Sequence, residues 1–423
     1  MTRKMRRSIA LLVLVLMLSA FTMSSCLVLG YGDDYATKTD VQDMINKGMN
    51  GNITVEGGDN YNVTINGADT DNTSAAKALL SAVSVKCVYQ TTSYGSAYQP
   101  GGSSKEKTSY GSGVIYKLDK EHGDAYIITN YHVVYHSQSN TENGISNKIS
   151  VFLYGLENEA YAIPATYIGG SMNYDLAVLK VDGSRILAES HAAAVTFADS
   201  DNVAVLDKAI AVGNPEALGI SATLGHINVD SEYITMEGAD GSTTIQIRVM
   251  RMDTAVNSGN SGGGLFNNRG ELIGIVNAKL NNSDNMSYSI PSNFVKSVVD
   301  NILYYCDGTK LEGVYRCYLG ITVSATKLYT VYDEERGTVL KREVVGVTGV
   351  ENGSLAKGVI KEGDIINSIT IDGTVYEVNR MYVVTDSMLS ARVGSLVSVN
   401  ITRGEETMDV VIEIKESSLT EIK

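Results

Sequence analysis

The segment at residues 257–263, Asn-Ser-Gly-Asn-Ser-Gly-Gly, contains two serines whose surroundings suit either a turn or a reactive hydroxyl. A serine can attack a carbonyl carbon when a base lies within hydrogen-bond reach, a carboxylate orients that base, and backbone N–H groups face the developing oxyanion. Glycines suit such a loop because they let the backbone approach a substrate without an intervening Cβ. The segment therefore predicts nucleophilic chemistry at Ser261, provided that the chain supplies a base and an acid.

Both the base and the acid have candidates upstream of this segment. His132 follows the apolar pair at 127–128, so the end of a strand would present it. Asp175 opens the apolar run at 176–179, where an unpaired carboxylate would be costly to bury. Each residue alone has an ordinary structural interpretation, as a strand-end histidine, a turn aspartate or a glycine-loop serine. Together, in the order His132, Asp175 and Ser261, they resemble chymotrypsin-like proteases.

The elements that must position these residues are predicted to be short strands. Apolar runs of four or five residues, separated by Gly, Asn and Asp, recur from about Ala75 onward and include 113–116, 125–128, 149–153 and 272–276. The chain has 41 Gly and only 4 Pro, which fits many tight turns between strands. The pattern predicts a mainly β architecture built as β-barrels or a sandwich, with barrels favoured.

Further motifs extend the resemblance to one family. The matching segments are GSGVI (111–115), TNYHVV (129–134), DLAVL (175–179), GNP (213–215), GNSGG (259–263) and SIP (289–291). They resemble the HtrA (Deg) family of serine proteases, and the similarity covers residues 75–416. A lone GNSGG is a weak signal, whereas the ordered set is specific. The resemblance implies a chymotrypsin-like double β-barrel protease domain at 75–300, a linker at 301–315, a PDZ domain (a small β-sandwich with helices) at 316–416 and a tail at 417–423.

The resemblance also implies a role for each matched residue. Ser261 would attack the scissile carbonyl, His132 would take its proton and return it to the leaving amine, and Asp175 would hold the imidazole tautomer. The oxyanion hole is expected at Gly259, Asn260 and Ser261, with the N–H groups of Gly259 and Ser261 as donors. Digestive relatives carry an aspartate where this chain has Asn260, so loop rearrangement is favoured over activation by N-terminal trimming.

The expected substrate pocket has three candidate residues. Ala255 stands where relatives specific for basic residues carry a pocket-floor carboxylate, so cleavage after Lys or Arg is not expected. Val256 and Leu280 are the candidate apolar walls. The resemblance implies cleavage after small or medium aliphatic residues of unfolded protein. Lys279 replaces an expected apolar residue and leaves the exact preference open.

The last part of the chain carries a second set of matches. Tyr318, Leu319, Gly320 and Ile321 resemble the carboxylate-binding loop of a PDZ domain, and the segments 361–366, 371–373 and 403–404 resemble its later strands and turns. Such a domain accepts a peptide strand along an exposed sheet edge, while consecutive backbone N–H groups hold the peptide carboxylate. C-terminal peptides are therefore expected partners. A turn of some other small β domain is the structural alternative.

The first 26 residues predict export. Four basic residues precede an apolar run from Ile9 to Leu18, which is shorter than a membrane-spanning helix and typical of a secretory signal. Met23-Ser24-Ser25-Cys26 resembles a bacterial lipobox. The resemblance implies a signal peptide at 1–26, acylation of Cys26, and a lipid anchor on the outer face of the membrane in the bacterial cell envelope. Plain secretion, with Cys26 as an ordinary thiol, is the alternative.

Residues 27–74 are expected to form a polar tether. Thr39 and Gln42 resemble a capping box, which predicts a short helix after Thr39. Polar and apolar residues alternate on both sides of the segment 57–60, which predicts a hairpin. An isolated hairpin is marginally stable in water, so it must pack on something or stay mobile.

The composition of the chain excludes some classes of binding partner, and the cysteines leave two states open. The formal net charge is −14, and loss of the four basic residues of the leader lowers it to −18. Such a surface repels a phosphate backbone, and no basic stripe or zinc-ligand spacing offsets it, so no nucleic acid is expected. No metal and no organic cofactor are expected either. Cys306 and Cys317 could form a disulfide or stay free, because connectivity cannot be deduced from sequence.

The motifs together predict an exported, lipid-anchored, ATP-independent serine endopeptidase. Its expected substrates are misfolded or unfolded exported proteins, and peptides at the PDZ domain are expected to regulate it. The family suggests a homo-oligomer, in particular a trimer. The alternative from another class is a non-proteolytic chaperone or adaptor that binds unfolded chains.

Overall fold

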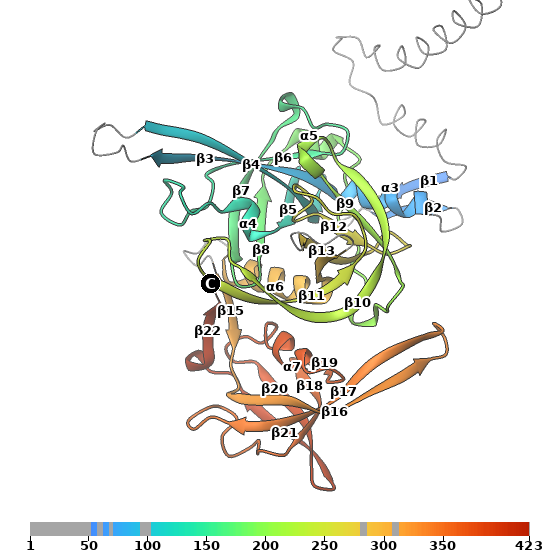
Figure 1. The fold of residues 1–423 in the computed structure, drawn as a ribbon. Coiled ribbons are helices and arrows are strands. Elements are labelled where there is room, and N and C mark those ends of the chain that lie inside the picture. The colour runs from blue at the N-terminus through green and yellow to red at the C-terminus, as the bar shows by residue number, and fades with distance from the viewer. Residues whose placement is uncertain are drawn as a thin grey trace, which may run out of the picture. The chain divides into compact units, whose positions relative to one another are not determined.

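The computed structural model describes residues 52–56, 62–66, 71–93, 103–279, 286–306 and 313–422. Within the compact unit that begins at Met49, two closed barrels are followed by a C-terminal sheet (Figure 1). The predicted mainly β class and double barrel are confirmed. The predicted signal peptide, Cys26 and the helix after Thr39 lie outside the described residues.

The first barrel is a closed six-stranded sheet in the order β3-β4-β5-β8-β7-β6. Alternate residues of its strands face inward, as Val83, Val85 and Cys87 do, and they are fully buried. Its strands and connections are β3 (Ala82–Ser93), β4 (Ser103–Asp119), β5 (Asp124–Thr129), α4 (Tyr131–Val134), β6 (Lys148–Leu153), η1 (Glu159–Tyr161), β7 (Ile163–Ser171), β8 (Leu176–Val181) and α5 (Arg185–Glu189).

The second barrel repeats this plan in the order β10-β11-β14-β13-β12-β9. Its elements are η2 (Ser200–Asn202), β9 (Lys208–Gly213), η3 (Pro215–Ala217), β10 (Ser221–Glu237), β11 (Thr244–Met252), β12 (Gly264–Phe266), β13 (Leu272–Lys279) and β14 (Ser287–Pro291). The short strand β12 is buried along its whole length, and Phe266 is completely inaccessible. Strand β12 follows the loop of Ser261 directly, so packing of this strand holds one end of that loop.

Two longer helices flank the barrels. In α6 (Ser292–Tyr305), the buried residues Val295, Val298, Val299 and Ile302 recur at helical spacing and join the core cluster that contains residues of both barrels. Short strands were expected from about Ala75, but the helix α3 (Asp71–Ser81) covers this position. The start of the predicted strands therefore differs from the structure. The predicted hairpin before it is present, because β1 (Asn52–Glu56) and β2 (Asn62–Asn66) pair antiparallel.

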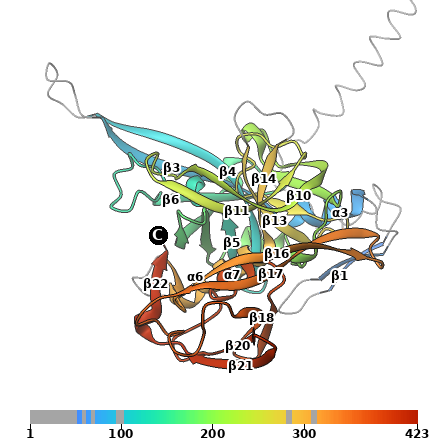
Figure 2. The same cartoon turned by 60° about the horizontal axis from the view of Figure 1, so that its bottom comes forward.

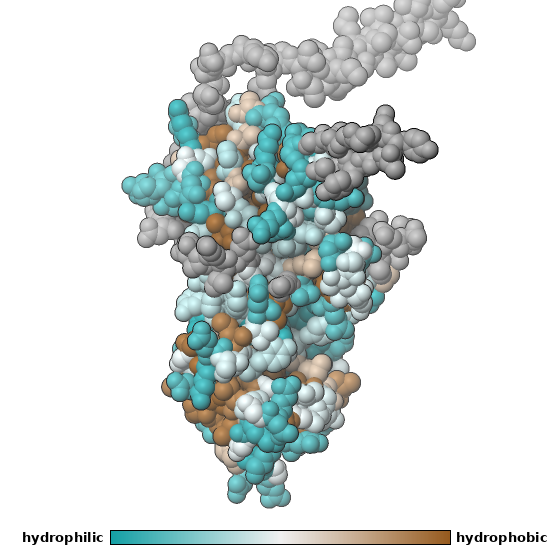
Figure 3. Space-filling model, turned by 90° about the vertical axis from the view of Figure 1, so that its left-hand side faces the viewer, coloured by the Kyte–Doolittle hydropathy of each residue, from teal (hydrophilic) through white to brown (hydrophobic). Residues whose placement is uncertain are grey.

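The C-terminal domain is a six-stranded sheet with its own apolar core. Its path is β16-β17-β18-β20-β21, and β19 pairs with β18, as Figure 2 shows from a second direction. On the face drawn in Figure 3, apolar side chains gather toward the lower part of the molecule. The elements are β16 (Ile321–Asp333), β17 (Thr338–Val350), β18 (Ile365–Ile371), β19 (Thr374–Glu377), α7 (Tyr382–Ser387), β20 (Leu396–Arg403), β21 (Glu406–Glu413) and η4 (Glu416–Ser418).

The predicted linker (301–315) and the predicted tail (417–423) contribute to two short strands that pair with each other. Helix α6 continues to Tyr305, and β15 (Val314–Cys317) pairs antiparallel with β22 (Leu419–Ile422). The chain end therefore closes back on the start of the C-terminal domain. Local sequence offers no signal for this pairing, because the two strands are short and far apart in the chain.

Cys306 and Cys317 do not form a disulfide in the structure, so the disulfide alternative is not the one adopted. Each thiol lies near a carbonyl oxygen, Cys306 near that of Gly313 at 3.4 Å and Cys317 near that of Ala391 at 3.5 Å. Burial raises the pKa of Cys317 to about 11, so this thiol stays protonated at neutral pH. No helix in the described part of the chain is long and apolar enough to cross a membrane.

A buried cation joins the second barrel to the C-terminal domain. Arg248 of β11 has a side chain only 4% exposed, and its Nη2 donates to Oδ2 of Asp386 at 2.7 Å. Its guanidinium also lies 3.9 Å from the ring centroid of Tyr382. Asp386 needs this partner, because burial raises the pKa of its carboxyl and the charge of Arg248 opposes that effect.

We expect Arg248→Met to lower the free energy of unfolding by about 3 kcal/mol, because it leaves the largely buried carboxylate of Asp386 without its charged partner. The double variant Arg248→Met with Asp386→Leu should recover most of that loss, since it removes both charges. Urea unfolding of the full chain, followed by circular dichroism, measures both effects. Equal stability of the single variant and the unmodified chain would show that the pair contributes nothing.

Candidate active site

The loop of Ser261 turns sharply between β11 and β12. Gly259 and Gly262 have φ angles of 97° and 84°, in the left-handed region that favours glycine. A Cβ on Gly262 would lie 2.2 Å from the carbonyl oxygen of Ser112, and one on Gly259 would lie 2.3 Å from that of Asn214. Glycine is therefore required at both positions by conformation and by close backbone approach.

The base and the acid form a tight pair on the first barrel. His132 lies in α4, just after β5, and its Nδ1 is 2.7 Å from Oδ2 of Asp175. The backbone N–H of His132 also donates to Oδ1 of Asp175 at 2.9 Å. Asp175 precedes β8 and has a φ of 48°, which aspartate tolerates better than most residues. Asn130 donates from Nδ2 to the backbone carbonyl of Asp175 at 2.7 Å and supports this conformation.

Asn277 of β13 connects this pair to the nucleophile. Its Nδ2 donates to Oδ2 of Asp175 at 2.5 Å, and its backbone carbonyl accepts from Oγ of Ser261 at 3.2 Å. The side chain of Asn277 is buried. Its amide must face Asp175 through nitrogen, because the carbonyl oxygen would repel the carboxylate. Sequence reasoning missed this residue, since an asparagine in an apolar strand carries no local motif.

The described residues show no hydrogen bond between Oγ of Ser261 and the ring of His132. The hydroxyl instead donates to the carbonyl of Asn277. The structure thus brings His132, Asp175 and Ser261 to one site, with the hydroxyl bonded to the carbonyl of Asn277 and not to the base. Hydrogen bonds between nucleophile and base are often long or absent without substrate.

Backbone donors of the expected oxyanion hole differ in availability. The N–H of Asn260 is bonded to the carbonyl of Asn257 at 3.1 Å, so it is not free to bind an oxyanion. The N–H groups of Gly259 and Ser261 have no acceptor among the described residues. The expected pair of donors, Gly259 and Ser261, is therefore accessible, whereas Asn260 serves to close the turn.

Ser112 of β4 holds the loop from the other barrel. Its Oγ donates to the carbonyl of Gly259 at 2.7 Å, and its N–H donates to the carbonyl of Ser261 at 2.8 Å. The N–H of Asn214 donates to the same Oγ at 2.8 Å. Glu216 donates from its N–H to the carbonyl of Ser258 at 2.7 Å. These contacts join the loop after β9 to the nucleophile loop.

Two of the three candidate pocket residues, Ala255 and Val256, lie in the described part of the chain. Ala255 is exposed beside the nucleophile loop, and its carbonyl accepts from Oγ1 of Thr223 at 3.0 Å. Val256 is buried in the core of the second barrel, so its side chain does not line an open surface. Leu280 lies outside the described residues. The backbone of Lys279 pairs with Ser287 at the end of β13.

The electrostatic environment of His132 favours the protonated ring. Burial disfavours the charge, but the charge of Asp175 and the hydrogen bond to it together outweigh burial. The pKa of His132 is therefore raised above its ordinary value of 6.5. The ring is still about a third exposed, at 34%, so substrate can reach it. Within the described residues, no group of His, Cys, Asp and Glu side chains could hold a metal ion.

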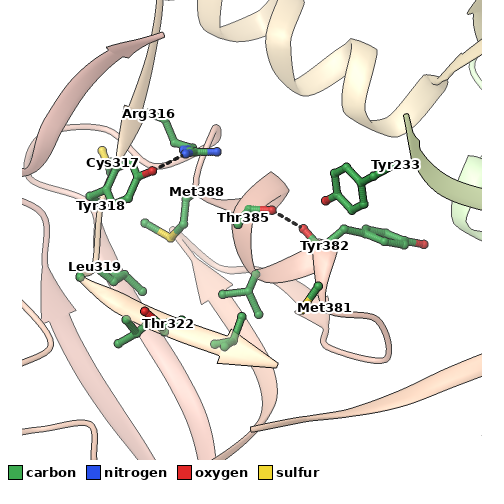
Figure 4. A pocket seen from close by; sticks show the side chains of 14 residues that line it. Tyr233, Arg316, Cys317, Tyr318, Leu319, Thr322, Met381, Tyr382, Thr385 and Met388 are labelled. Carbon is green, nitrogen blue, oxygen red and sulfur yellow. Dashed lines mark hydrogen bonds between the residues drawn. The ribbon is translucent and has the colours of Figure 1, made fainter. Parts of the chain in front are cut away.

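A separate pocket of about 300 Å³ lies at the expected carboxylate-binding loop. Its lining includes Tyr318, Leu319, Gly320, Ile321, Val384 and Met388. Figure 4 shows Tyr318, Leu319 and Met388 near one another among the side chains that line it. Figure 4 also shows Tyr233, from β10 of the second barrel, at the far end of the pocket. The side chain of Arg316 donates to the hydroxyl of Tyr318 at 2.7 Å.

The chain is similar to known serine proteases. A family model described as "Trypsin-like peptidase domain" matches residues 111–275. "Serine protease Do-like HtrA" of Lactococcus lactis is 31% identical over 323 residues, or 71% of this chain and 72% of that protein. "Periplasmic serine endoprotease DegP" of Escherichia coli is 28% identical over 333 residues, or 76% of this chain and 60% of that protein. The solved "HtrA-type protease AlgW with tripeptide" is 25% identical, with a TM-score of 0.49 over 82% of this chain and 97% of that one.

We expect kcat/KM for peptide hydrolysis to fall on the acid side with a midpoint above pH 6.5, because only neutral His132 can accept the proton. A raised pKa means that the ring gains its proton at a higher pH, so the base is lost as pH falls through that value. A pH profile of kcat/KM measures the midpoint. An acid limb centred below pH 6.5 would contradict the role of Asp175 in raising this pKa.

We expect Asn277→Ala to lower kcat/KM about 10- to 150-fold, since hydrogen bonds to charged groups contribute about 1.5–3 kcal/mol. The acid limb should also move to higher pH, because a carboxylate with one donor fewer attracts the imidazolium more strongly.

A matched control for Asn277 exists outside the site. Asn267→Ala removes an amide that donates to Glu271 at 2.7 Å. This variant should leave both kcat/KM and the acid limb unchanged. If Asn277→Ala behaves like Asn267→Ala, then Asn277 has no positioning role.

Proposed function

The chain belongs to the HtrA family of serine proteases, and we propose that it is an ATP-independent endopeptidase that cleaves misfolded or unfolded exported proteins at the cell envelope. One observation carries the proposal. Asn277 contacts both Asp175, the partner of His132, and Ser261, so nucleophile, base and acid share one site. The polypeptide substrate is inferred from the family, and its natural identity is left open.

In the proposed reaction, Ser261 attacks the scissile carbonyl carbon while its hydroxyl proton passes to Nε2 of His132. The hydroxyl must first rotate away from the carbonyl of Asn277. The N–H groups of Gly259 and Ser261 would stabilise the oxyanion, and His132 would return the proton to the leaving amine. Water, deprotonated by His132, then hydrolyses the acyl-enzyme. Asp175 holds the ring in place throughout.

Substrate preference is proposed from the pocket candidates. Ala255 provides no carboxylate for a basic side chain, so cleavage after small or medium aliphatic residues is proposed. Because Val256 is buried in the core, it would shape the pocket through its backbone or through packing rather than as an open wall. Leu280 and Lys279 are retained as candidates for the remaining wall.

We assign residues 316–416 to a PDZ domain that binds C-terminal peptides at Tyr318, Leu319, Gly320 and Ile321. The apolar pocket at this loop and the edge strand β16 beside it support the assignment. Regulation of the protease by such peptides is supported by the ion pair between Asp386 of α7 and Arg248. Helix α7 lines the pocket, and β11, which carries Arg248, leads into the loop of Ser261.

The proposed location is the outer face of a bacterial membrane. A signal peptide at 1–26, acylation of Cys26 and a tether at 27–74 are the sequence features that support it. One relative is named a periplasmic endoprotease, and this name agrees with the proposed export of the chain. Assembly as a homo-oligomer, in particular a trimer, is proposed from the family alone.

A second candidate function is a chaperone or adaptor that binds unfolded chains without cutting them. The hydrogen bond of the Ser261 hydroxyl to the carbonyl of Asn277, in place of one to His132, is the observation that favours it. A resting enzyme that a peptide activates accounts for the same observation. The two candidates differ in whether hydrolysis ever depends on Ser261.

We expect the full chain, solubilised in mild detergent, to degrade unfolded casein and its Ser261→Ala variant to leave casein intact, because the variant lacks the nucleophile. Electrophoresis and product masses measure cleavage and the preferred residue before each cut. If both proteins are inert, C-terminal peptides are added to release a latent enzyme. Continued inactivity, or equal cleavage by both proteins, would overturn the proposed function.

A further inference from the structure

Strand β16 extends well beyond the pocket at its beginning. It is an edge strand of the C-terminal sheet and pairs only with β17 among the described strands. Only Ile321, Thr322 and Val323 of its thirteen residues line the pocket. The rest of β16 forms a hairpin with β17 that projects beyond the other strands (Figure 1). A pocket for a short peptide does not need a strand of this length.

The projecting part of β16 is exposed and apolar. All eight residues from Ala325 to Tyr332 are exposed. Leu328 is 73% exposed and Tyr332 is 62% exposed, and Val339, opposite Tyr332 on β17, is 56% exposed. Because opposite and alternate residues share a face, these three side chains lie on one face of the hairpin, together with Thr330, Lys341 and Glu343, and they form the apolar surface of that face.

The outer edge of this strand lacks the usual protection against pairing. Natural edge strands are commonly interrupted by proline, charged residues or bulges, or are covered by another element. Between Ala325 and Tyr332 there is no proline, and Lys327 is the only charged residue. Register shifts occur before Lys327, and pairing with β17 is regular from there to Asp333. The edge therefore offers a regular row of N–H and C=O groups beside apolar side chains.

The pocket and this edge are continuous and have a common direction. A peptide whose carboxylate lies at Leu319–Ile321 must run antiparallel to β16, so residues further along the strand meet residues further upstream in the peptide. Two register shifts in the pairing of β16 with β17, at 322–323 and 325–327, lie between the pocket and the projecting part. Leu328 is seven residues beyond Ile321, which is about 23 Å at 3.3 Å per residue. A bound chain therefore reaches the apolar surface about seven to eleven residues before its C-terminus.

We propose that the outer edge of β16 from Ala325 to Tyr332 binds the upstream part of an unfolded polypeptide whose C-terminus occupies the pocket. This proposal rests on the proposed peptide-binding function of that pocket. The partner is an extended chain with apolar residues at alternate positions in the segment upstream of its C-terminus. A second copy of this chain, paired edge to edge, would use only the projecting part, whereas one polypeptide covers the edge from end to end.

The test uses the full chain with Ser261→Ala, which binds peptides without cutting them. Fluorescence anisotropy gives Kd for a tetrapeptide, for a twelve-residue peptide with the same last four residues and alternating apolar residues upstream, and for a twelve-residue peptide with Gly and Ser upstream. We expect the apolar twelve-residue peptide to bind at least about tenfold more tightly than the other two, a change of about 1.4 kcal/mol.

Two variants test whether the gain in affinity arises at the β16 edge of the sheet. Leu328→Thr with Tyr332→Thr keeps strand propensity but removes the apolar surface, so it should abolish the gain and leave the tetrapeptide Kd unchanged. Val411→Thr is the matched control, because Val411 is 59% exposed on β21, at the opposite edge of the same sheet. The control should keep the full gain.

Each other outcome overturns a defined part of the argument. If the tetrapeptide fails to bind, the peptide-binding function of the pocket is wrong, and this inference falls with it. If the tetrapeptide binds but the apolar twelve-residue peptide binds no better, only the extended edge is wrong. A gain that survives in the double variant also overturns it. Concentration-dependent dimerisation that the double variant abolishes, without any gain from peptide length, identifies a second copy as the occupant.

Discussion

The buried carboxylate of Asp175 is the constraint on which the site depends. Its side chain is almost inaccessible, so its charge is tolerable only if donors surround it. Those donors are the backbone and ring of His132 and the amide of Asn277. Asn277 belongs to the second barrel, whereas His132 and Asp175 belong to the first. Satisfying one carboxylate therefore holds the two barrels in a single relative arrangement, and the same contacts orient the base.

The nucleophile loop of the second barrel is also held by a residue of the first barrel. Ser112 of the first barrel bonds to the carbonyls of Gly259 and Ser261 in the second. The carbonyls of Ser258 and Asn260 share peptide planes with the N–H groups of Gly259 and Ser261, and they accept from the N–H groups of Glu216 and Gly263. These bonds fix the direction of the two donors, which is the preorganisation that acyl transfer requires. Contacts between the barrels thus hold the base, the acid and the nucleophile loop, and closure of each barrel supplies the rigidity.

Strand β11 connects the C-terminal domain to the nucleophile loop, beside other contacts such as the ion pair of Arg380 with Asp230 of β10. Arg248 of β11 is buried against Asp386 and Tyr382 of α7, and β11 leads into the loop of Ser261. Helix α7 also forms a wall of the apolar pocket, opposite the start of β16. A ligand in this pocket therefore contacts an element that is ion-paired to the catalytic barrel. The buried pair makes that connection specific, because either charge without the other would be costly.

Local patterns determined the fold class and three residues of the site. Alternating apolar runs predicted the barrel strands, and the motifs around His132, Asp175 and Ser261 identified them because their chemistry depends on nearby sequence. Only the tertiary structure decided the roles of Asn277 and Ser112, the acceptor of the Ser261 hydroxyl, the reduced state of Cys306 and Cys317, and the pairing of β22 with β15. Each of these depends on contacts between segments far apart in the chain, and such contacts exist only after the barrels close and the C-terminal sheet forms. An asparagine or a serine within a strand carries no local sign of which distant carboxylate or carbonyl it will meet.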